Sequence, residues 1–461
     1  MCSPIRAQEP AKSVAAKLEE ICTKSDLPGM SVAVVNTEGL VQSQSYGVRK
    51  RQTTDNIDAT DRFPIASNTK SMTAVMAAAL VEAGKIQWKT SIGEVWPGAK
   101  DKDIHPSLRK VTLDQLLSHQ SGLTKDIADI SKEAWREFFQ EKESPLQARR
   151  KMLKMVLSQP PSAPQDKFSY SNVGYAVAAA MLEARAGESF ESLMKKTLFD
   201  PLEMRSADFR TMDSAGKLKS PLLWGHERDG KPIDPRSMMA ENPAVYAACG
   251  TVHLTIEDYA KYARWQLAGK PAPVLRTQAA FDHLRESQVD YTAPGSRYAC
   301  GWICVDTPLG PAFTHSGSNT NTFALIWVIP DANFAGIVCT NSGQSQAFTA
   351  CDQMMTFMIG KFAAKKNEPV TPMPKDVSPK QLVGRYQLTP SFVFDVKVKG
   401  DHLAVGITNQ PTQEVFAESP TMWAYRTVQA KLEFHIGADG RATALTLHQN
   451  GLAQKAKRLK D

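Results

Sequence analysis

A serine and a lysine lie three residues apart in the segment Phe63-Pro-Ile-Ala-Ser67-Asn-Thr-Lys70. The alanine-rich apolar stretch over 72–81 and the glycine that follows it predict that Ser67 stands at the head of a helix. Residues three apart on a helix share a face, so the Ser67 hydroxyl and the Lys70 amine can meet. Burial disfavours the charged form of a lysine, and a neutral amine beside a hydroxyl is a general base beside a nucleophile. The pair therefore predicts covalent catalysis by serine.

A Ser-x-x-Lys pattern alone is weak evidence, because a polar first turn with a capping serine has the same sequence. Two later motifs strengthen the prediction. Tyr170-Ser-Asn172 stands just before a predicted helix, and His315-Ser-Gly317 stands before two predicted strands. Tyrosine and histidine can transfer protons, and a glycine lets a substrate approach the backbone closely. Taken singly, the tyrosine and the histidine are ordinary structural residues, but the ordered set predicts one active site.

The order Ser-x-x-Lys, Tyr-x-Asn and basic residue-x-Gly resembles that of penicillin-binding proteins and class C β-lactamases. Residues 9 to about 365 resemble this serine hydrolase superfamily, which includes D-peptidases and family VIII-type esterases. The phrases that support the resemblance are Phe63-Pro-Ile-Ala-Ser67, Leu113-Asp-Gln-Leu-Leu-Ser-His-Gln-Ser-Gly-Leu123 and Gly250-Thr-Val-His-Leu-Thr-Ile-Glu-Asp258. The C-terminal part resembles the lipocalin-like barrels that follow such domains in some D-aminopeptidases and esterases.

The resemblance implies a role for each residue of the set. Ser67 would attack a carbonyl and form an acyl-enzyme, and Lys70 would take its proton. Tyr170 would act as a base or proton relay and would later activate the deacylating water. Asn172 would bind the substrate amide or the lysine. The backbone N–H groups of Ser67 and Ser318 would form the oxyanion hole.

His315 stands where many relatives have lysine, and Gly317 lets the substrate approach the strand. Histidine is mostly neutral near pH 7 and binds a carboxylate less firmly than lysine does. If His315 acts as a cation, kcat/KM for an anionic substrate falls as the pH rises through about 6–7. This departure weakens the expectation of an efficient β-lactamase, although some D-peptidases and esterases also carry histidine there. His119 and Cys249 are expected to be structural residues.

We therefore expect a serine hydrolase that acts on amide or ester bonds through a Ser67 acyl-enzyme. D-amino-acid peptides, D-amino-acid amides and carboxylic esters are the expected substrates, all small molecules or short peptides. A β-lactamase that opens β-lactam rings is the alternative with the same chemistry. A penicillin-binding or structural protein without turnover is the alternative of another class. No cofactor is expected.

Composition excludes several other classes. The chain has 461 residues, a formal charge of +7, 42% hydrophobic and 22% charged residues, which is typical of globular proteins. The charge is spread along the chain without a nucleic-acid motif, and no apolar run reaches the roughly 18 residues of a transmembrane segment. Seven cysteines without a C-x-x-C pair predict neither a disulfide framework nor a metal site.

The start of the chain bears on its location. A cysteine directly after the first methionine, as in Met1-Cys2-Ser3, is what a lipoprotein-type leader leaves when it is replaced by a start codon, and an ordinary cytosolic start can have the same residues. A periplasmic or secreted location is therefore expected, with the cytoplasm as the alternative. The pattern leaves the oligomeric state open.

The remaining pattern predicts the elements that position these residues. A helix and a strand hairpin over 9–46 are matched by strands and a helix over 313–364, with mostly helical segments such as 131–160 and 175–186 between them. This order predicts an α/β (α+β) fold of the β-lactamase/transpeptidase-like type, in which an antiparallel sheet built from both ends is flanked by helices. The Ser67 helix would lie between the sheet and the helical insert.

A change in composition predicts a second domain. Residues 365–378 are Pro-rich and charged, which is typical of a linker. They would join a β-lactamase-like serine hydrolase domain over 1–364 to a small all-β barrel over 379–461. The strands predicted for this barrel cover 382–386, 392–398, 402–407, 415–417, 431–436 and 442–449, followed by a last strand and tail.

Overall fold

The computed structural model describes residues 13–140, 143–209, 223–237, 240–293, 295–364, 378–389, 392–408, 410–426, 428, 430–449 and 452–459. The predicted linker lies almost wholly outside the described residues, as does the beginning of the first predicted helix. The described helices are α1 (Val14–Lys24), α2 (Thr69–Glu82), α3 (Ile92–Val95), α4 (Leu113–Leu117), α5 (Lys132–Phe139), α6 (Pro145–Leu157), α7 (Asn172–Ala186), α8 (Phe190–Met194), α9 (Ala247–Gly250), α10 (Ile256–Ala268), α11 (Gln278–His283) and α12 (Gln346–Phe362). Within the described part of the chain, none of these combines the length and apolar composition that a membrane span requires.

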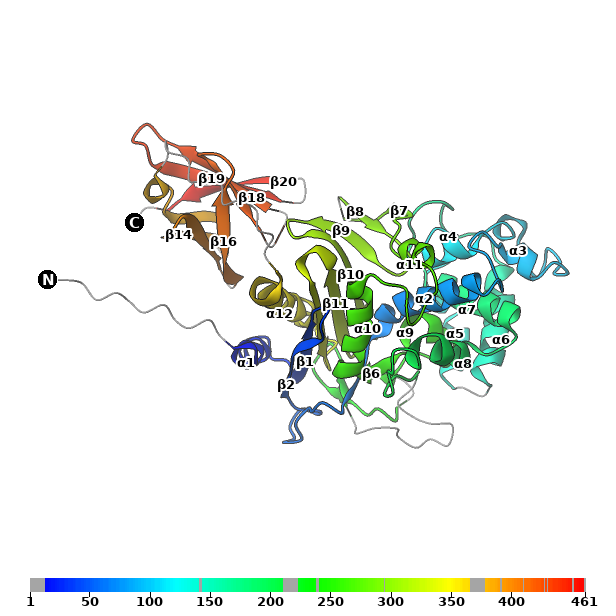
Figure 1. The fold of residues 1–461 in the computed structure, drawn as a ribbon. Coiled ribbons are helices and arrows are strands. Elements are labelled where there is room, and N and C mark those ends of the chain that lie inside the picture. The colour runs from blue at the N-terminus through cyan, green and yellow to red at the C-terminus, as the bar shows by residue number, and fades with distance from the viewer. Residues whose placement is uncertain are drawn as a thin grey trace.

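An eight-stranded antiparallel sheet forms the centre of the larger part, in the order β2-β1-β12-β11-β10-β9-β8-β7 (Figure 1). Its strands are β1 (Gly29–Val35), β2 (Leu40–Gly47), β7 (Val289–Asp290), β8 (Ser296–Tyr298), β9 (Ile303–Thr307), β10 (Gly310–Ser318), β11 (Phe323–Ile329) and β12 (Phe334–Thr340). Because β1 pairs with both β2 and β12, the N-terminal hairpin and the later strands share one sheet. The predicted fold class, with a sheet built from both ends, is confirmed.

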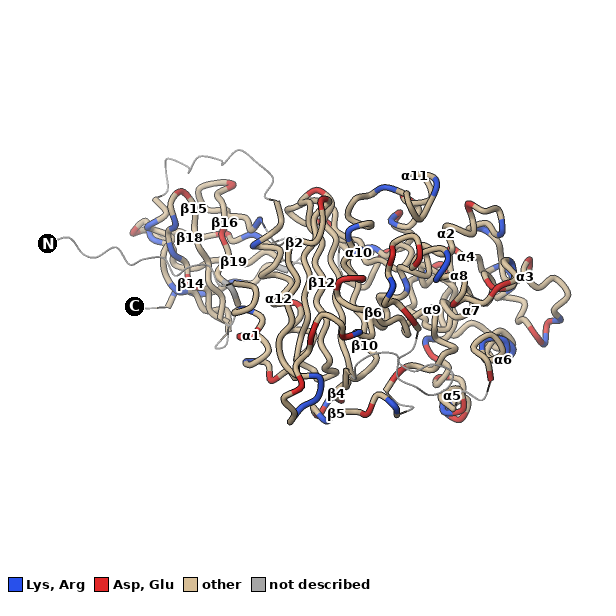
Figure 2. The backbone as a smooth tube through the Cα atoms, turned by 60° about the horizontal axis from the view of Figure 1, so that its bottom comes forward, with Lys and Arg blue, Asp and Glu red and all other residues tan. Residues whose placement is uncertain are grey.

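Helices cover both faces of this sheet. Along β1, Val32 and Val34 pack into the core formed with α1 and α12, whereas Ala33 and Val35 pack into the core on the opposite face. This alternation follows from the two-residue period of a strand. The tube through the central strands is accordingly almost free of charged residues, which gather on the surrounding helices and loops in both signs (Figure 2).

The helical insert lies on the face of the sheet opposite α12 (Figure 1). Helix α2 packs against α7 and α9, and the turn before it contacts β10 and β11, so the Ser67 helix lies between sheet and insert as predicted. The predicted helix over 131–160 is two helices, because Ser144 caps a new helix that begins at Pro145. Helix α4 is short and ends at Leu117, where Ser118 is its C-cap.

The C-terminal residues form a closed eight-stranded barrel. Its strands are β13 (Gly384–Thr389), β14 (Phe392–Lys399), β15 (His402–Ile407), β16 (Gln410–Ala417), β17 (Met422–Tyr425), β18 (Ala430–Ile436), β19 (Ala442–Gln449) and β20 (Leu452–Arg458), each paired with the next and β13 with β20. The sequence pattern missed β17, which is only four residues long but buries Trp423 in the barrel core. Strand β16 contacts α12, so the barrel adjoins the sheet face opposite the Ser67 helix.

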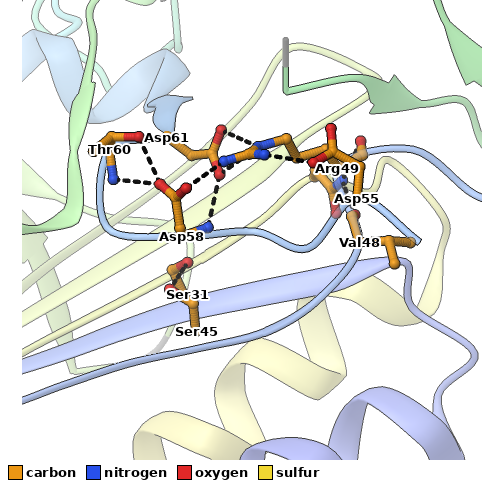
Figure 3. A network of polar contacts seen from close by, with 9 residues as sticks. Ser31, Ser45, Val48, Arg49, Asp55, Asp58, Thr60 and Asp61 are labelled. Atoms are coloured by element: carbon orange, nitrogen blue, oxygen red, sulfur yellow. Dashed lines mark hydrogen bonds and ion pairs between the residues drawn. The ribbon is translucent and has the colours of Figure 1, made fainter. Parts of the chain in front are cut away.

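Arg49 ties the loop before the Ser67 segment to three aspartates (Figure 3). Its Nε lies 2.9 Å from Asp61 Oδ1, and its Nη1 and Nη2 lie 2.6 Å from Asp55 Oδ1 and Asp58 Oδ2. The Asp61 side chain is 0% exposed, whereas that of Asp55 is 61% exposed. Burial raises the pKa of Asp61, and the hydrogen bond from Arg49 opposes this effect. Arg49 is thus the cation that offsets the burial of this carboxylate.

Arg49→Leu is expected to lower the free energy of unfolding by about 3–5 kcal/mol, because it leaves the buried Asp61 without a cation. Asp55→Asn removes an exposed partner of the same guanidinium and is expected to cost less than about 1 kcal/mol. Urea unfolding followed by tryptophan fluorescence measures both. Equal losses in the two variants would show that the burial of Asp61 is not what makes Arg49 important.

Candidate active site

Ser67 lies in a short 3₁₀ turn, η1 (Ala66–Asn68), that leads directly into α2. The turn follows β3 (Arg62–Pro64), which pairs with β6 (His253–Thr255). Ala66 has a φ of 45°, a left-handed conformation that residues other than glycine rarely adopt. The paired strand before the turn and the apolar helix after it hold this strained corner, and Ser67 stands at its tip.

Lys70 brings three groups together at the start of α2. Its side chain is fully buried, and its Nζ lies 3.1 Å from Ser67 Oγ, 2.8 Å from Asn172 Oδ1 and 3.1 Å from the Cys249 carbonyl oxygen. A neutral amine has two N–H bonds and one lone pair. Asn172 and Cys249 can only accept at these atoms, so they would take both N–H bonds and direct the lone pair toward Ser67. The geometry therefore suits Lys70 as the proton acceptor from the serine.

Tyr170 contacts the same serine through its hydroxyl group. Its OH lies 2.8 Å from Ser67 Oγ, and its ring centroid lies 4.7 Å from Lys70 Nζ. His119 packs against this ring with centroids 4.3 Å apart, and its Nδ1 accepts the Ser171 N–H over 3.1 Å. The His119 ring therefore packs against Tyr170, which is a candidate catalytic residue.

The backbone of β10 passes directly over the Ser67 turn. A Cβ added to Gly317 would lie 2.2 Å from the Ile65 carbonyl oxygen and 2.7 Å from the Ser67 nitrogen, so a side chain does not fit there. This close approach places the backbone of Ser318, the next residue and the end of β10, beside Ser67. The two predicted oxyanion-hole residues are thus neighbours in the structure.

The surroundings of His315 favour a neutral imidazole over the cation considered from the sequence. Burial and the nearby Lys70 lower its pKa to about 3. Its Nδ1 lies 2.7 Å from the Ser316 carbonyl oxygen, which can only accept, so Nδ1 carries the proton. Its Nε2 lies 3.1 Å from Tyr298 OH and accepts from it. Both ring nitrogens of the neutral imidazole are therefore engaged within the protein.

This assignment predicts that His315 adds no pH dependence to the binding of anions. Because its pKa of about 3 lies below the assay range, its charge does not change between about pH 5.5 and 7.5. The ratio of kcat/KM for p-nitrophenyl hemisuccinate to that for p-nitrophenyl butyrate is expected to stay flat across this range. Groups that titrate for both substrates cancel in the ratio. A ratio that falls as the pH rises through about 6–7 would restore a cationic His315.

Three contributors to the site carry no signal in the sequence motifs. Cys249 supplies a backbone carbonyl, which its residue type does not reveal. Tyr298 reaches His315 from β8, with β9 lying between their strands. Asp126 accepts a hydrogen bond from Asn172 Nδ2 over 2.8 Å, which leaves Asn172 Oδ1 facing Lys70. Each depends on contacts between segments far apart in the chain.

One group of described residues has the ligand types of a metal site. The ligand atoms of Asp114, His283 and Cys300 all lie within 4.8 Å of one another. His283 Nε2 lies 2.8 Å from Asp114 Oδ1, however, which is a direct hydrogen bond with no space for an ion between the two atoms. Trp88 stacks on the His283 ring with centroids 4.1 Å apart. These contacts are those of a packed carboxylate–histidine pair.

Known proteins resemble the chain over most of its length. Penicillin-binding protein 4 of Amycolatopsis lactamdurans is 24% identical over 394 residues, covering 80% of this chain and 96% of that protein. The octameric penicillin-binding protein homologue from Pyrococcus abyssi superposes with a TM-score of 0.61 at 20% identity, covering 95% of this chain and 98% of that one. A D-stereospecific amidohydrolase from Streptomyces sp. superposes with a TM-score of 0.58 at 20% identity, covering 72% and 97%.

The family comparison defines the larger part of the chain. The family described as Beta-lactamase matches residues 14–354, a span that includes the central sheet, the helical insert and every candidate residue of the Ser67 site. The solved structures share this fold. The chain therefore belongs to the beta-lactamase family.

Proposed function

We propose that this protein is a serine hydrolase that cleaves an ester or amide bond through an acyl-enzyme on Ser67. The observation that carries the proposal is the pair of contacts at Ser67 Oγ, 3.1 Å from Lys70 Nζ and 2.8 Å from Tyr170 OH. A nucleophile within hydrogen-bond reach of two proton-transfer groups is the arrangement that acyl transfer requires.

In the acylation step, Lys70 takes the Ser67 proton as Oγ attacks the substrate carbonyl. The backbone N–H groups of Ser67 and Ser318 bind the oxyanion that develops. Tyr170 donates a proton to the leaving group as the tetrahedral intermediate collapses, and regains a proton from Lys70, whose Nζ lies 4.7 Å from the Tyr170 ring centroid. The ester bond to Ser67 replaces the bond that is broken, so no cofactor takes part.

In the deacylation step, Tyr170 accepts a proton from the attacking water as it passes its own proton to Lys70, and Lys70 returns that proton to Ser67 Oγ as the serine leaves. Asn172 holds Lys70 in place throughout, because its side-chain oxygen binds Nζ and its side-chain nitrogen is anchored to Asp126. The same groups thus serve both halves of the reaction.

The neutral, hydrogen-bonded imidazole of His315 favours esters and amides over β-lactams as substrates. Penicillins and cephalosporins carry a carboxylate next to the ring, and a lysine at this position would pair with it. The neutral His315 has both nitrogens engaged by Ser316 and Tyr298, so it offers neither a charge nor a free N–H. The amidohydrolase among the similar structures adds D-amino-acid amides to the substrates worth testing. Hydrolysis of β-lactams remains the second candidate because of the family match.

A panel of p-nitrophenyl esters, D- and L-amino-acid p-nitroanilides and nitrocefin tests the proposal. Multiple turnovers of an ester or anilide are expected, with kcat/KM at least about tenfold above that for nitrocefin. Rapid nitrocefin hydrolysis would make the protein a β-lactamase instead. A stoichiometric burst without turnover on every substrate would identify a penicillin-binding protein that does not turn over.

A further inference from the structure

His119 departs in two ways from an ordinary packed residue. Its φ is 62°, a left-handed conformation that is uncommon outside glycine. Its side chain is 0% exposed, and its Nε2 has no hydrogen-bond partner among the described residues. Backbone strain and a buried polar atom without a partner both lower the stability of a fold, and both gather at functional sites. The two features together point to a role for His119 beyond packing.

His119 binds the residues on both sides of Tyr170. Its carbonyl oxygen accepts the Ser169 N–H over 2.8 Å, and its Nδ1 accepts the Ser171 N–H over 3.1 Å. The Tyr170 ring lies between these two hydrogen bonds in the chain and packs on the imidazole, with centroids 4.3 Å apart. Because both chain neighbours of Tyr170 are bound to one residue, the position of the tyrosine is tied to that of His119.

The protonation state of the imidazole suits it to this task. Burial, the nearby Lys70 and His315 lower the pKa of His119 well below its usual value. The ring is therefore neutral, and since Nδ1 accepts from Ser171, the proton lies on Nε2. A protonated ring would carry N–H groups at both nitrogens and could not accept from Ser171. When Lys70 takes the serine proton, its charge favours the neutral imidazole further, so the hydrogen bond is retained through the reaction.

We propose that His119 is a positioning residue, which holds the Tyr170 hydroxyl at Ser67 through the hydrogen bond that its Nδ1 accepts from Ser171. The inference rests on the proposed function, in which the Tyr170 hydroxyl transfers protons. Ser171 is buried, so its N–H is left unsatisfied when the acceptor is lost, and the segment shifts to find another partner. The Tyr170 hydroxyl lies 2.8 Å from Ser67 Oγ, and a shift of about 1 Å removes that contact.

Two substitutions separate the acceptor of His119 from its ring. His119→Phe keeps an aromatic ring beside Tyr170 but has no acceptor, and its kcat for p-nitrophenyl butyrate is expected to fall by about 10²-fold. His119→Asn loses the ring, but its Oδ1 can accept the Ser171 N–H and asparagine tolerates a left-handed backbone. Its kcat is expected to stay within about fivefold of the wild type. Rates are normalised to the folded fraction, which circular dichroism measures.

A double-mutant cycle shows whether His119 acts through the tyrosine hydroxyl. In Tyr170→Phe the hydroxyl is already absent, so adding His119→Phe is expected to lower kcat by less than about threefold further. A residue that only supports the fold would lower kcat by the same factor with and without the hydroxyl. If His119→Phe does not fold, His119→Gly takes its place, because glycine adopts the left-handed backbone freely and also lacks the acceptor.

Gln120→Ala is the matched control, since Gln120 follows His119 in the chain and its side chain binds Ser118 and the Asp166 carbonyl. Its kcat is expected to stay within about threefold of the wild type. If the variant without an acceptor keeps the wild-type kcat, loses no more than His119→Asn, or loses equally in both backgrounds, the inference is overturned while a Ser67 hydrolase stands. If the wild type turns over no substrate of the panel, the proposed function fails and this inference fails with it.

Discussion

Ser67→Ala is expected to lower kcat/KM by about 10⁴-fold or more and to abolish labelling by a fluorophosphonate or penicillin probe. The substitution removes the oxygen that Lys70 and Tyr170 both contact, so no covalent intermediate can form. Ser67 is only partly buried, and loss of its hydroxyl leaves the apolar packing of α2 unchanged. Intact-mass spectrometry measures the label, and p-nitrophenyl ester turnover measures the rate.

Ser316→Ala is the matched control for this experiment. Ser316 lies beside His315 on β10, but it binds the imidazole through its backbone carbonyl, which the substitution retains. Labelling and turnover are therefore expected to persist. A label that remains on another serine in Ser67→Ala would sink the assignment of the nucleophile. Circular dichroism spectra that match the wild type show that a loss of labelling is not a loss of fold.

Local structure explains the part of the site that the sequence could predict. Ser67 and Lys70 are one helical turn apart, so their contact follows from helix geometry. Tyr170 and Asn172 flank Ser171, which caps the start of α7, so both are fixed at one helix end. The sheet was predictable for a similar reason, because its apolar strands at both ends of the region needed partners on each side.

Contacts between distant segments explain what the sequence could not predict. Tyr298 meets His315 only because their strands are separated by a single strand in the folded sheet. Burial and the nearby Lys70 favour the neutral histidine, and its position in the motif could not show either effect. Asp126 lies in a loop and belongs to no sequence motif, and its contact with Asn172 forms only in the folded chain. The surroundings of the candidate nucleophile are therefore harder to predict from the sequence than the nucleophile itself.

Tyr170→Phe is expected to lower kcat by about 10²- to 10⁴-fold, the usual contribution of a general acid–base group. The variant keeps the ring that packs against His119 and lies near Lys70, but it loses the OH that is 2.8 Å from Ser67 Oγ. Because Lys70 remains to deprotonate Ser67, acylation is expected to slow less than deacylation. An acyl-enzyme should then accumulate, which intact-mass spectrometry during turnover detects.

Tyr175→Phe separates this role of the hydroxyl from the packing of the ring. The Tyr175 ring also lies near Lys70, at 5.5 Å from Nζ, but its OH donates to the Leu117 carbonyl and not to Ser67. Its kcat is expected to change by less than about tenfold, as for a hydrogen bond outside the reacting groups. If Tyr170→Phe behaves like this control, or loses activity without accumulating an acyl-enzyme, the water of deacylation is activated elsewhere. If only Tyr170→Phe stalls at the acyl-enzyme, the hydroxyl beside Ser67 is the group that completes the reaction.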